Sequence, residues 1–118
     1  MDCEDKVMVF QFDHLAMQVD DISEAVDWYL RVIPDTTVLH KDESWAFIDA
    51  NGTRLAFVKK DQHPGHLAWR VSEEKLEAMA QEYSKPIKTH RDNTRSFYLE
   101  APGGYWIEII CMKGSQWE

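Results

Sequence analysis

The chain has 118 residues, 44% of them hydrophobic and 29% charged, which suits one small globular domain with its own core. Its formal net charge of −8 at pH 7 argues against nonspecific nucleic-acid binding, and no apolar run approaches the ~20 residues that span a bilayer. The N-terminal residues lack a signal-peptide pattern, and the two cysteines, Cys3 and Cys111, support no disulfide framework. We therefore expect a cytoplasmic protein with no membrane or nucleic-acid partner.

The first half of the chain predicts a strand, a helix and three further strands. Residues 10–19 alternate as a strand does, and Asp21 with Glu24 three residues later is typical of a helix start. The helix carries one apolar stripe and ends at Pro34. Asn51-Gly52 is a strong hairpin signal. The stripe consists of Ile22, Ala25, Val26, Tyr29, Leu30 and Ile33, and the three strands are expected at residues 36–41, 44–50 and 53–60.

After a short linker at residues 61–64, the second half is expected to replay this order. A strand at residues 65–71 precedes a helix with Ser72 as its N-cap, and residues 101–104 form the last turn. The helix stripe consists of Leu76, Met79, Ala80 and Tyr83, and the strands are expected at residues 87–90, 95–100 and 104–112.

An internal repeat relates the two halves. His14-Leu15-Ala16 returns as His66-Leu67-Ala68, an offset of 52 residues. Each half reads β-α-β-β-β, so we predict an α+β fold, one domain built from two tandem modules at about residues 10–60 and 65–113. Five further pairs share the offset: Val19 and Val71, Pro34 and Pro86, Thr37 and Thr89, Ser44 and Ser96, Gly52 and Gly104.

Both repeats open on a histidine that faces away from the helix. In the first strand, residues 15, 17 and 19 are apolar and must pack on the helix, so His14 points to the other face. The same parity applies to His66. Glu108 lies in a strand that is apolar on both faces, where a carboxylate is costly unless it is paired or bound to metal. Two histidines and one carboxylate form a ligand set for a catalytic divalent ion.

Each of these residues also has a plainer interpretation. A lone strand histidine is more often hydrogen-bonded or solvent-facing than a ligand, and a strand glutamate is usually on the surface. The repeat-equivalent positions favour the ligand interpretation. Position 56, which corresponds to Glu108, is Ala56, so the first half supplies only a histidine. The prediction is a site with three protein ligands and open positions, which is typical of catalysis.

Three segments carry a family pattern: Phe12 to Val19, Pro64 to Val71 and Ser96 to Ile109. They resemble the vicinal oxygen chelate superfamily, also called the glyoxalase/bleomycin-resistance/dioxygenase superfamily. The resemblance implies cup-shaped mixed or antiparallel sheets and a metal site of His14, His66 and Glu108 for Fe²⁺, Mn²⁺, Ni²⁺ or Zn²⁺. It also implies a homodimer with sites shared between subunits, in which His14 of one subunit joins His66 and Glu108 of the other. A cup formed within one chain stays open as the alternative.

The chemistry that the resemblance implies is chelation of vicinal oxygens of a small metabolite, in a lyase, isomerase or transferase type of reaction. Ala56 in place of a fourth ligand argues against glyoxalase I activity. Fosfomycin transferases match at Tyr98 and Lys88. They place Thr or Cys where this chain has Ala16, and their phosphonate-binding arginine falls near Trp117, which argues against fosfomycin inactivation.

Three alternatives stay open beside this enzyme. An Fe²⁺ ring-cleaving dioxygenase would use His90 and Tyr98 as further groups, although such enzymes are usually much longer. A noncatalytic, antibiotic-sequestering protein would share the fold, although the bleomycin-binding proteins lack the ligand set. A purely structural dimer would fill the ligand face with side chains.

The remaining site predictions follow from strand parity and the family match. Tyr98 is expected to act with Glu108 in catalysis, as a hydrogen-bond donor or general acid, with core packing as the alternative. Arg54 and Arg70 share the ligand face and are candidates for binding a carboxylate or phosphate, with surface salt bridging equally open. The other substrate-binding candidates are Gln18, His90 and Trp106, and His40 and His63 are expected to be exposed or hydrogen-bonding.

Overall fold

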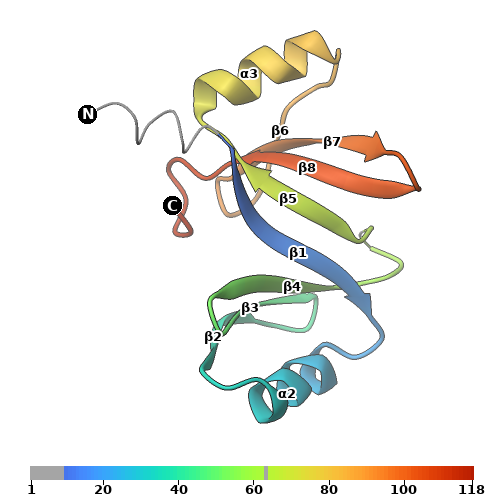
Figure 1. Ribbon diagram of the computed structural model, residues 1–118, viewed down its shortest axis with the longest axis vertical. Helices are drawn as coiled ribbons and strands as arrows, with labels where there is room; N and C mark the ends of the chain where they lie inside the picture. Colours follow the sequence, from blue (N-terminus) through green and yellow to red (C-terminus); the bar gives the residue numbers. More distant parts are fainter. Residues whose placement is uncertain (1–9, 63) are drawn as a thin grey trace. The chain divides into compact units, whose positions relative to one another are not determined.

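The computed structural model describes residues 10–62 and 64–118. The described chain falls into two compact units (Figure 1), one formed by residues 14–67 and the other by residues 68–118 together with those that precede His14. The predictions for the N-terminal segment with Cys3, and for His63, lie outside the described residues. Cys111 is buried and has a free thiol.

The 14–67 unit contains one helix and a four-stranded sheet in the order β2-β3-β4-β1. Strands β2, β3 and β4 are antiparallel neighbours, whereas β1 runs parallel to β4. The first three residues of β1 belong to the other unit. The elements lie within one residue of their predicted limits: β1 (Gln11–Val19), α2 (Ile22–Val32), β2 (Thr36–Lys41), β3 (Trp45–Ala50) and β4 (Thr53–Lys59).

Helix α2 begins and packs as its sequence predicts. The Asp21 side chain accepts a hydrogen bond from the Glu24 amide at 3.0 Å, which satisfies one of the unpaired N–H groups of the first turn. Ile22 and Val26 are buried against Phe57 and other apolar residues of the sheet. The predicted helix-facing side of β1 packs against the same cluster, so the opposite face of β1 carries His14.

The hairpin between β3 and β4 forms at Asn51-Gly52, as predicted. Both residues have positive φ, 54° and 95°, the conformation of the turn that suits the twist of a two-residue hairpin. The Asp49 carboxylate accepts a hydrogen bond from the Gly52 amide at 2.7 Å. This turn sets the register that pairs Phe47 with Ala56.

The second unit repeats the design of the first. Its sheet order is β5-β8-β7-β6, which matches the order β1-β4-β3-β2 of the first unit and confirms the predicted α+β repeat. Ser72 caps the helix by accepting from the Lys75 amide at 3.1 Å. The elements are β5 (His66–Arg70), α3 (Glu73–Glu82), β6 (Lys88–Thr89), β7 (Arg95–Ala101) and β8 (Tyr105–Cys111). β6 is shorter than the predicted residues 87–90.

Two predicted members of the helix stripes are wrong. Leu30 is 47% exposed, because 3.6 residues per turn place it about 80° from Ile22 around the helix axis, at the edge of the stripe. Tyr83 is 46% exposed, because α3 ends at Glu82 and Tyr83 has left the helical conformation. Leu76 and Ala80 form the buried part of the α3 stripe.

Candidate metal centre

His14 and His66 lie side by side within the 14–67 unit. Their exposed fractions are 8% and 5%, their ring centroids are 5.5 Å apart with an interplanar angle of 73°, and a nitrogen of one ring lies within 4.8 Å of a nitrogen of the other. Both come from one chain here, which is the arrangement that the family resemblance left open as its alternative. Two imidazoles this close are compatible with one shared ion.

The carbonyl group of Pro64 determines the tautomer of His66. Its Nδ1 lies 3.0 Å from the carbonyl oxygen of Pro64, and since a carbonyl only accepts, Nδ1 carries the proton. A neutral ring then presents the lone pair of Nε2. A backbone carbonyl that fixes the tautomer in this way is typical of histidines that bind metal. The residues present therefore fit a metal ligand at this position.

The local backbone explains how β5 approaches β1 here. A Cβ at Gly65 would lie 3.2 Å from the carbonyl oxygen of Ala16, a tighter contact than side chains normally make. The absence of a side chain at Gly65 lets the start of β5 come close to β1. His66 follows directly and faces His14.

Aromatic and cationic groups surround His14 in the same unit. The Phe47 ring contacts the His14 ring edge to face at 5.5 Å, and the Arg54 guanidinium lies over Phe47 at 5.4 Å. Ala16 and Ala56 pair between β1 and β4 on this face and are both buried. Position 56 therefore carries a methyl group where the second unit carries Glu108.

Glu108 belongs to the second unit and is 4% exposed. The Ser96 hydroxyl donates to its Oε2 at 2.7 Å, and His90 Nε2 lies 2.7 Å from the Ser96 hydroxyl oxygen. Tyr98 pairs directly with Glu108 across β7 and β8. Burial, and then the Glu108 carboxylate, raise the pKa of Tyr98, so its hydroxyl stays a donor at neutral pH.

The other residues considered in the sequence analysis have the following contacts and exposures. Arg70 donates to Asp13 at 2.9 and 3.1 Å and to the Trp117 carbonyl oxygen at 2.9 Å. Gln18 is exposed and donates to the Lys60 carbonyl oxygen at 3.4 Å. Trp106 is 38% exposed. Exposed His40 lies 2.9 Å from Asp42 and stacks on Trp45.

Two buried polar residues next to predicted site residues were not singled out from the sequence. Ser96 shares strand parity with Tyr98, which was the only signal that it faces Glu108. Asp13 precedes His14 and is 6% exposed, but the sequence does not show that its partner is Arg70, 57 residues away.

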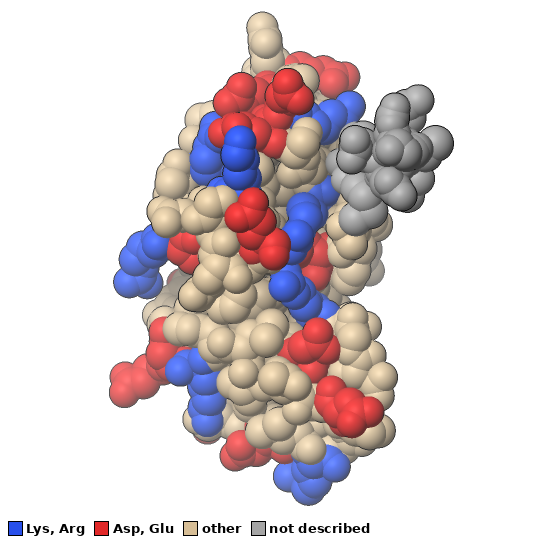
Figure 2. All heavy atoms as spheres, turned by 90° about the vertical axis from the view of Figure 1, so that its left-hand side faces the viewer, with Lys and Arg blue, Asp and Glu red and all other residues tan. Residues whose placement is uncertain are grey.

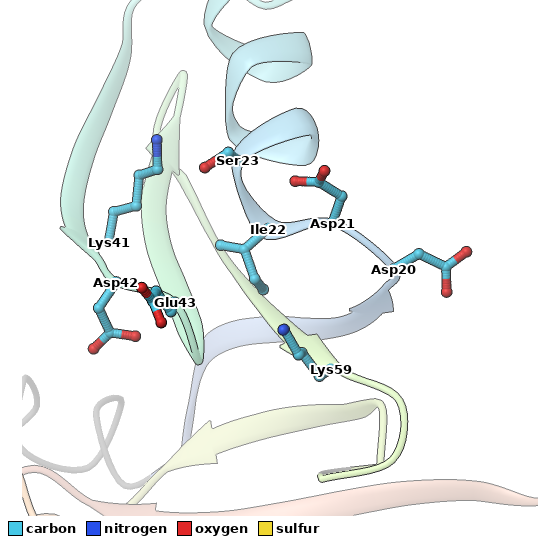
Figure 3. A pocket seen from close by; sticks show the side chains of 8 residues that line it. All are labelled: Asp20, Asp21, Ile22, Ser23, Lys41, Asp42, Glu43 and Lys59. Atoms are coloured by element: carbon cyan, nitrogen blue, oxygen red, sulfur yellow. The ribbon is translucent and has the colours of Figure 1, made fainter.

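The surface also contains a polar hollow of about 540 Å³ in the 14–67 unit. Figure 3 shows its side chains coming from the start of α2, the end of β2 and the end of β4. The lining residues are Asp20, Asp21, Ile22, Ser23, Lys41, Asp42, Glu43 and Lys59, and none of them is a predicted site residue.

Figure 2 shows acidic and basic side chains intermingled on the face in view. Over the described residues, we find no helix of the length and apolarity that a membrane crossing requires.

Comparisons with known proteins agree on the fold. Residues 11–109 match the family model described as the Glyoxalase/Bleomycin resistance protein/Dioxygenase superfamily. No curated protein shows significant sequence similarity to the chain.

Three solved structures illustrate the structural likeness. An NAD-dependent benzaldehyde dehydrogenase from Legionella pneumophila has a TM-score of 0.66 at 17% identity, covering 84% of this chain and 97% of that one. A superfamily member from Vibrio splendidus 12B01 has a TM-score of 0.61 at 13% identity, covering 86% and 97%. Homoprotocatechuate 2,3-dioxygenase from Brevibacterium fuscum, as an E323L mutant, has a TM-score of 0.64 at 16% identity, covering 87% of this chain but 32% of the enzyme. At these identities the likeness establishes the fold.

Proposed function

Because the chain belongs to the glyoxalase/bleomycin resistance protein/dioxygenase superfamily, we propose that it is a divalent-metal-dependent enzyme acting on a small metabolite with vicinal oxygens. His14, His66 and Glu108 are the proposed ligands. The observation that carries the proposal is the buried His14–His66 pair, with its nitrogens within 4.8 Å. The tautomer of His66 supports it, because Nε2 is left as a ligand atom.

The donor set agrees with a catalytic site. Two nitrogens and one carboxylate leave coordination positions for substrate oxygens, and Ala56 removes the fourth protein ligand. This donor set does not choose among Fe²⁺, Mn²⁺, Ni²⁺ and Zn²⁺, all of which accept imidazole and carboxylate. When bound, such an ion supplies Lewis-acid stabilisation of negative charge that develops on a chelated oxygen.

The side chains of this chain supply the remaining roles in the proposal. Tyr98 is the proposed hydrogen-bond donor or general acid. Its protonated hydroxyl beside Glu108 supports the donor role. Arg54 is the preferred candidate for an anionic substrate group, since its guanidinium lies over Phe47 beside His14. Arg70 already binds Asp13 and would have to share that guanidinium. Gln18, His90 and Trp106 complete the proposed substrate contacts.

The first experiment is metal analysis of anaerobically purified protein. We expect about one divalent ion per subunit in the wild type, and loss of most of it in His14→Ala and His66→Ala. His40→Ala is the matched control, because His40 is an exposed histidine bonded to Asp42, and it should retain the metal. Metal-free wild type, or equal metal content in His66→Ala, would overturn the proposal.

The proposal includes a homodimer with shared sites, in which His14 of one subunit joins His66 and Glu108 of the other. A site formed within one chain, as the His14–His66 pair is here, is the alternative. Mixing His14→Ala with His66→Ala chains tests this arrangement. If sites are shared, a hybrid dimer has one intact site and one lacking both groups, and statistical mixing restores about a quarter of the sites. If each site lies within one chain, mixing restores none.

A ring-cleaving dioxygenase is the second candidate, since both of its expected extra groups, His90 and Tyr98, lie against Glu108. A screen of α-keto thiohemiacetals, epoxides and catechols separates the candidates, because only catechol turnover consumes dioxygen. Tight ligand binding that is insensitive to chelators, without turnover, would identify a sequestering protein instead. The cytoplasmic location stays a prediction, to be checked by fractionation.

A further inference from the structure

A chain of two hydrogen bonds, from His90 through Ser96, reaches the Glu108 carboxylate, which is also hydrogen-bonded to Tyr98. The Ser96 hydroxyl lies 2.7 Å from Glu108 Oε2, and the two residues are 1% and 4% exposed. An ionised carboxylate only accepts hydrogen bonds, so Ser96 donates its single proton to Oε2. A charge-assisted bond of this length is among the stronger hydrogen bonds in proteins.

The direction of the second bond follows from the first. Because the Ser96 proton is already donated, the 2.7 Å contact between Ser96 and His90 Nε2 must be donated by His90. His90 Nε2 lies 3.8 Å from Glu108 Oε2, too far for a direct hydrogen bond. His90 therefore acts on Glu108 through Ser96.

A tight turn holds His90 in place. The His90 amide donates to the Thr94 carbonyl oxygen at 2.8 Å, and the Asn93 amide donates to the His90 carbonyl oxygen at 3.0 Å. The Asp92 carboxylate accepts from the Thr94 amide and hydroxyl at 3.1 and 2.7 Å, and from Trp117 Nε1 at 2.9 Å. The imidazole is thus presented to Ser96 by a segment with several internal hydrogen bonds.

We propose that Ser96 and His90 are a positioning pair that orients the Glu108 carboxylate as a metal ligand. The inference rests on the proposed function, in which Glu108 is a ligand. The Ser96 bond restricts the rotation of the carboxylate, and it leaves lone pairs for a metal because the two oxygens have about four acceptor sites between them. Outer-shell partners of this kind typically change metal affinity by about 10- to 100-fold.

The test measures Mn²⁺ affinity by calorimetry, and the melting temperature of the metal-free protein, for the wild type and three variants. Ser96→Ala should weaken Mn²⁺ binding by about 10- to 100-fold, while Ser96→Thr, which retains the hydroxyl, should stay within about threefold. His90→Phe leaves Ser96 in place, and its Mn²⁺ affinity should lie between those of Ser96→Ala and Ser96→Thr. His40→Phe is the matched control at an exposed histidine and should bind as the wild type.

The metal-free melting temperature separates positioning from general stability. The positioning role is overturned if Ser96→Ala and His90→Phe bind Mn²⁺ as tightly as the wild type. It is also overturned if both variants lose affinity and melting temperature together and Ser96→Thr does not restore the affinity. If Ser96→Thr does not fold, the Mn²⁺ affinity of His90→Phe is compared with that of His40→Phe. Equal affinities of these two variants would overturn the positioning role. If the wild type binds none of Mn²⁺, Fe²⁺, Ni²⁺ and Zn²⁺, the proposed function is overturned and this inference with it. If the wild type binds metal and the variants bind it equally well, only this inference is overturned.

Discussion

The carbonyl oxygen of Pro64 lies 3.0 Å from Nδ1 of His66 and orients the imidazole. The contact joins Pro64, in the segment that leads into β5, to the first residue of that strand. It leaves Nε2 as the ligand atom and fixes the ring plane. The geometry of the histidine pair therefore depends on the backbone around Gly65 as well as on the histidines.

Gly65→Ala should disturb the histidine pair. The added Cβ would lie 3.2 Å from the Ala16 carbonyl oxygen, so the start of β5 must shift away from β1. Overpacking of this kind destabilises by about 1–3 kcal/mol, and we expect Mn²⁺ affinity to fall several-fold because His66 moves with the strand. Urea unfolding and calorimetry measure the two effects. Affinity and stability both equal to the wild type would show that the strands tolerate the methyl group.

Asp13→Ala should be strongly destabilising. The Asp13 side chain is 2% exposed and pairs with Arg70, which is 28% exposed, so truncation leaves a guanidinium without its carboxylate. Breaking a buried pair costs about 3–5 kcal/mol, and the partial exposure of Arg70 places our expectation near the lower end. Glu73→Ala removes the ion pairs of Glu73 with Arg95 and Lys113. The Glu73 side chain is 44% exposed, so the loss should cost less than about 1 kcal/mol. Equal losses in the two variants would argue against a special role for the Asp13 pair.

Asp21→Ala should weaken α2 by removing its N-cap. The Asp21 side chain accepts from the Glu24 amide at 3.0 Å, and loss of such a cap costs about 1 kcal/mol. Asp21→Asn retains an accepting oxygen and should recover most of the stability in urea unfolding. Asp20→Ala is the neighbouring control, since its contact to Lys60 is 3.7 Å long and solvent-exposed. A loss as large in Asp20→Ala would point to net charge instead of the cap.

Asp42 should make stability depend on pH in the acidic range. Hydrogen bonds from the Ser44 side chain, from His40 and from the backbone amides of Ser44 and Trp45 lower the pKa of Asp42. A carboxyl group with a lowered folded-state pKa stabilises the fold above its unfolded pKa, near pH 4, and loses that contribution as the pH falls further.

Comparing the wild type with Asp42→Asn in thermal melts from pH 7 to pH 2 tests this sign. The advantage of the wild type should be constant above about pH 5 and shrink below about pH 4. Glu43→Gln provides a control at the next carboxylate. An advantage that grows as the pH falls would contradict the prediction.

Much of the fold was accessible from local patterns. Alternation, the Asp21 and Ser72 caps and the Asn51-Gly52 turn depend on neighbouring residues, so most element limits lie within one or two residues of prediction. The burial predicted for Leu30 and Tyr83 was wrong, because these residues lie at the edge and at the end of a helix stripe. A side chain at such a position is buried only if residues of other elements pack against it.

The repeat, the α+β fold and the strand faces that carry His14, His66 and Glu108 could be predicted from residue order, because strand parity depends on it alone. The contacts between distant side chains could not. The tertiary structure placed His14 beside His66 in one chain, set Ser96 and His90 on Glu108, and committed Arg70 to Asp13. These contacts depend on strand register and on segments up to 57 residues apart, and no periodicity along the chain specifies which side chains will meet.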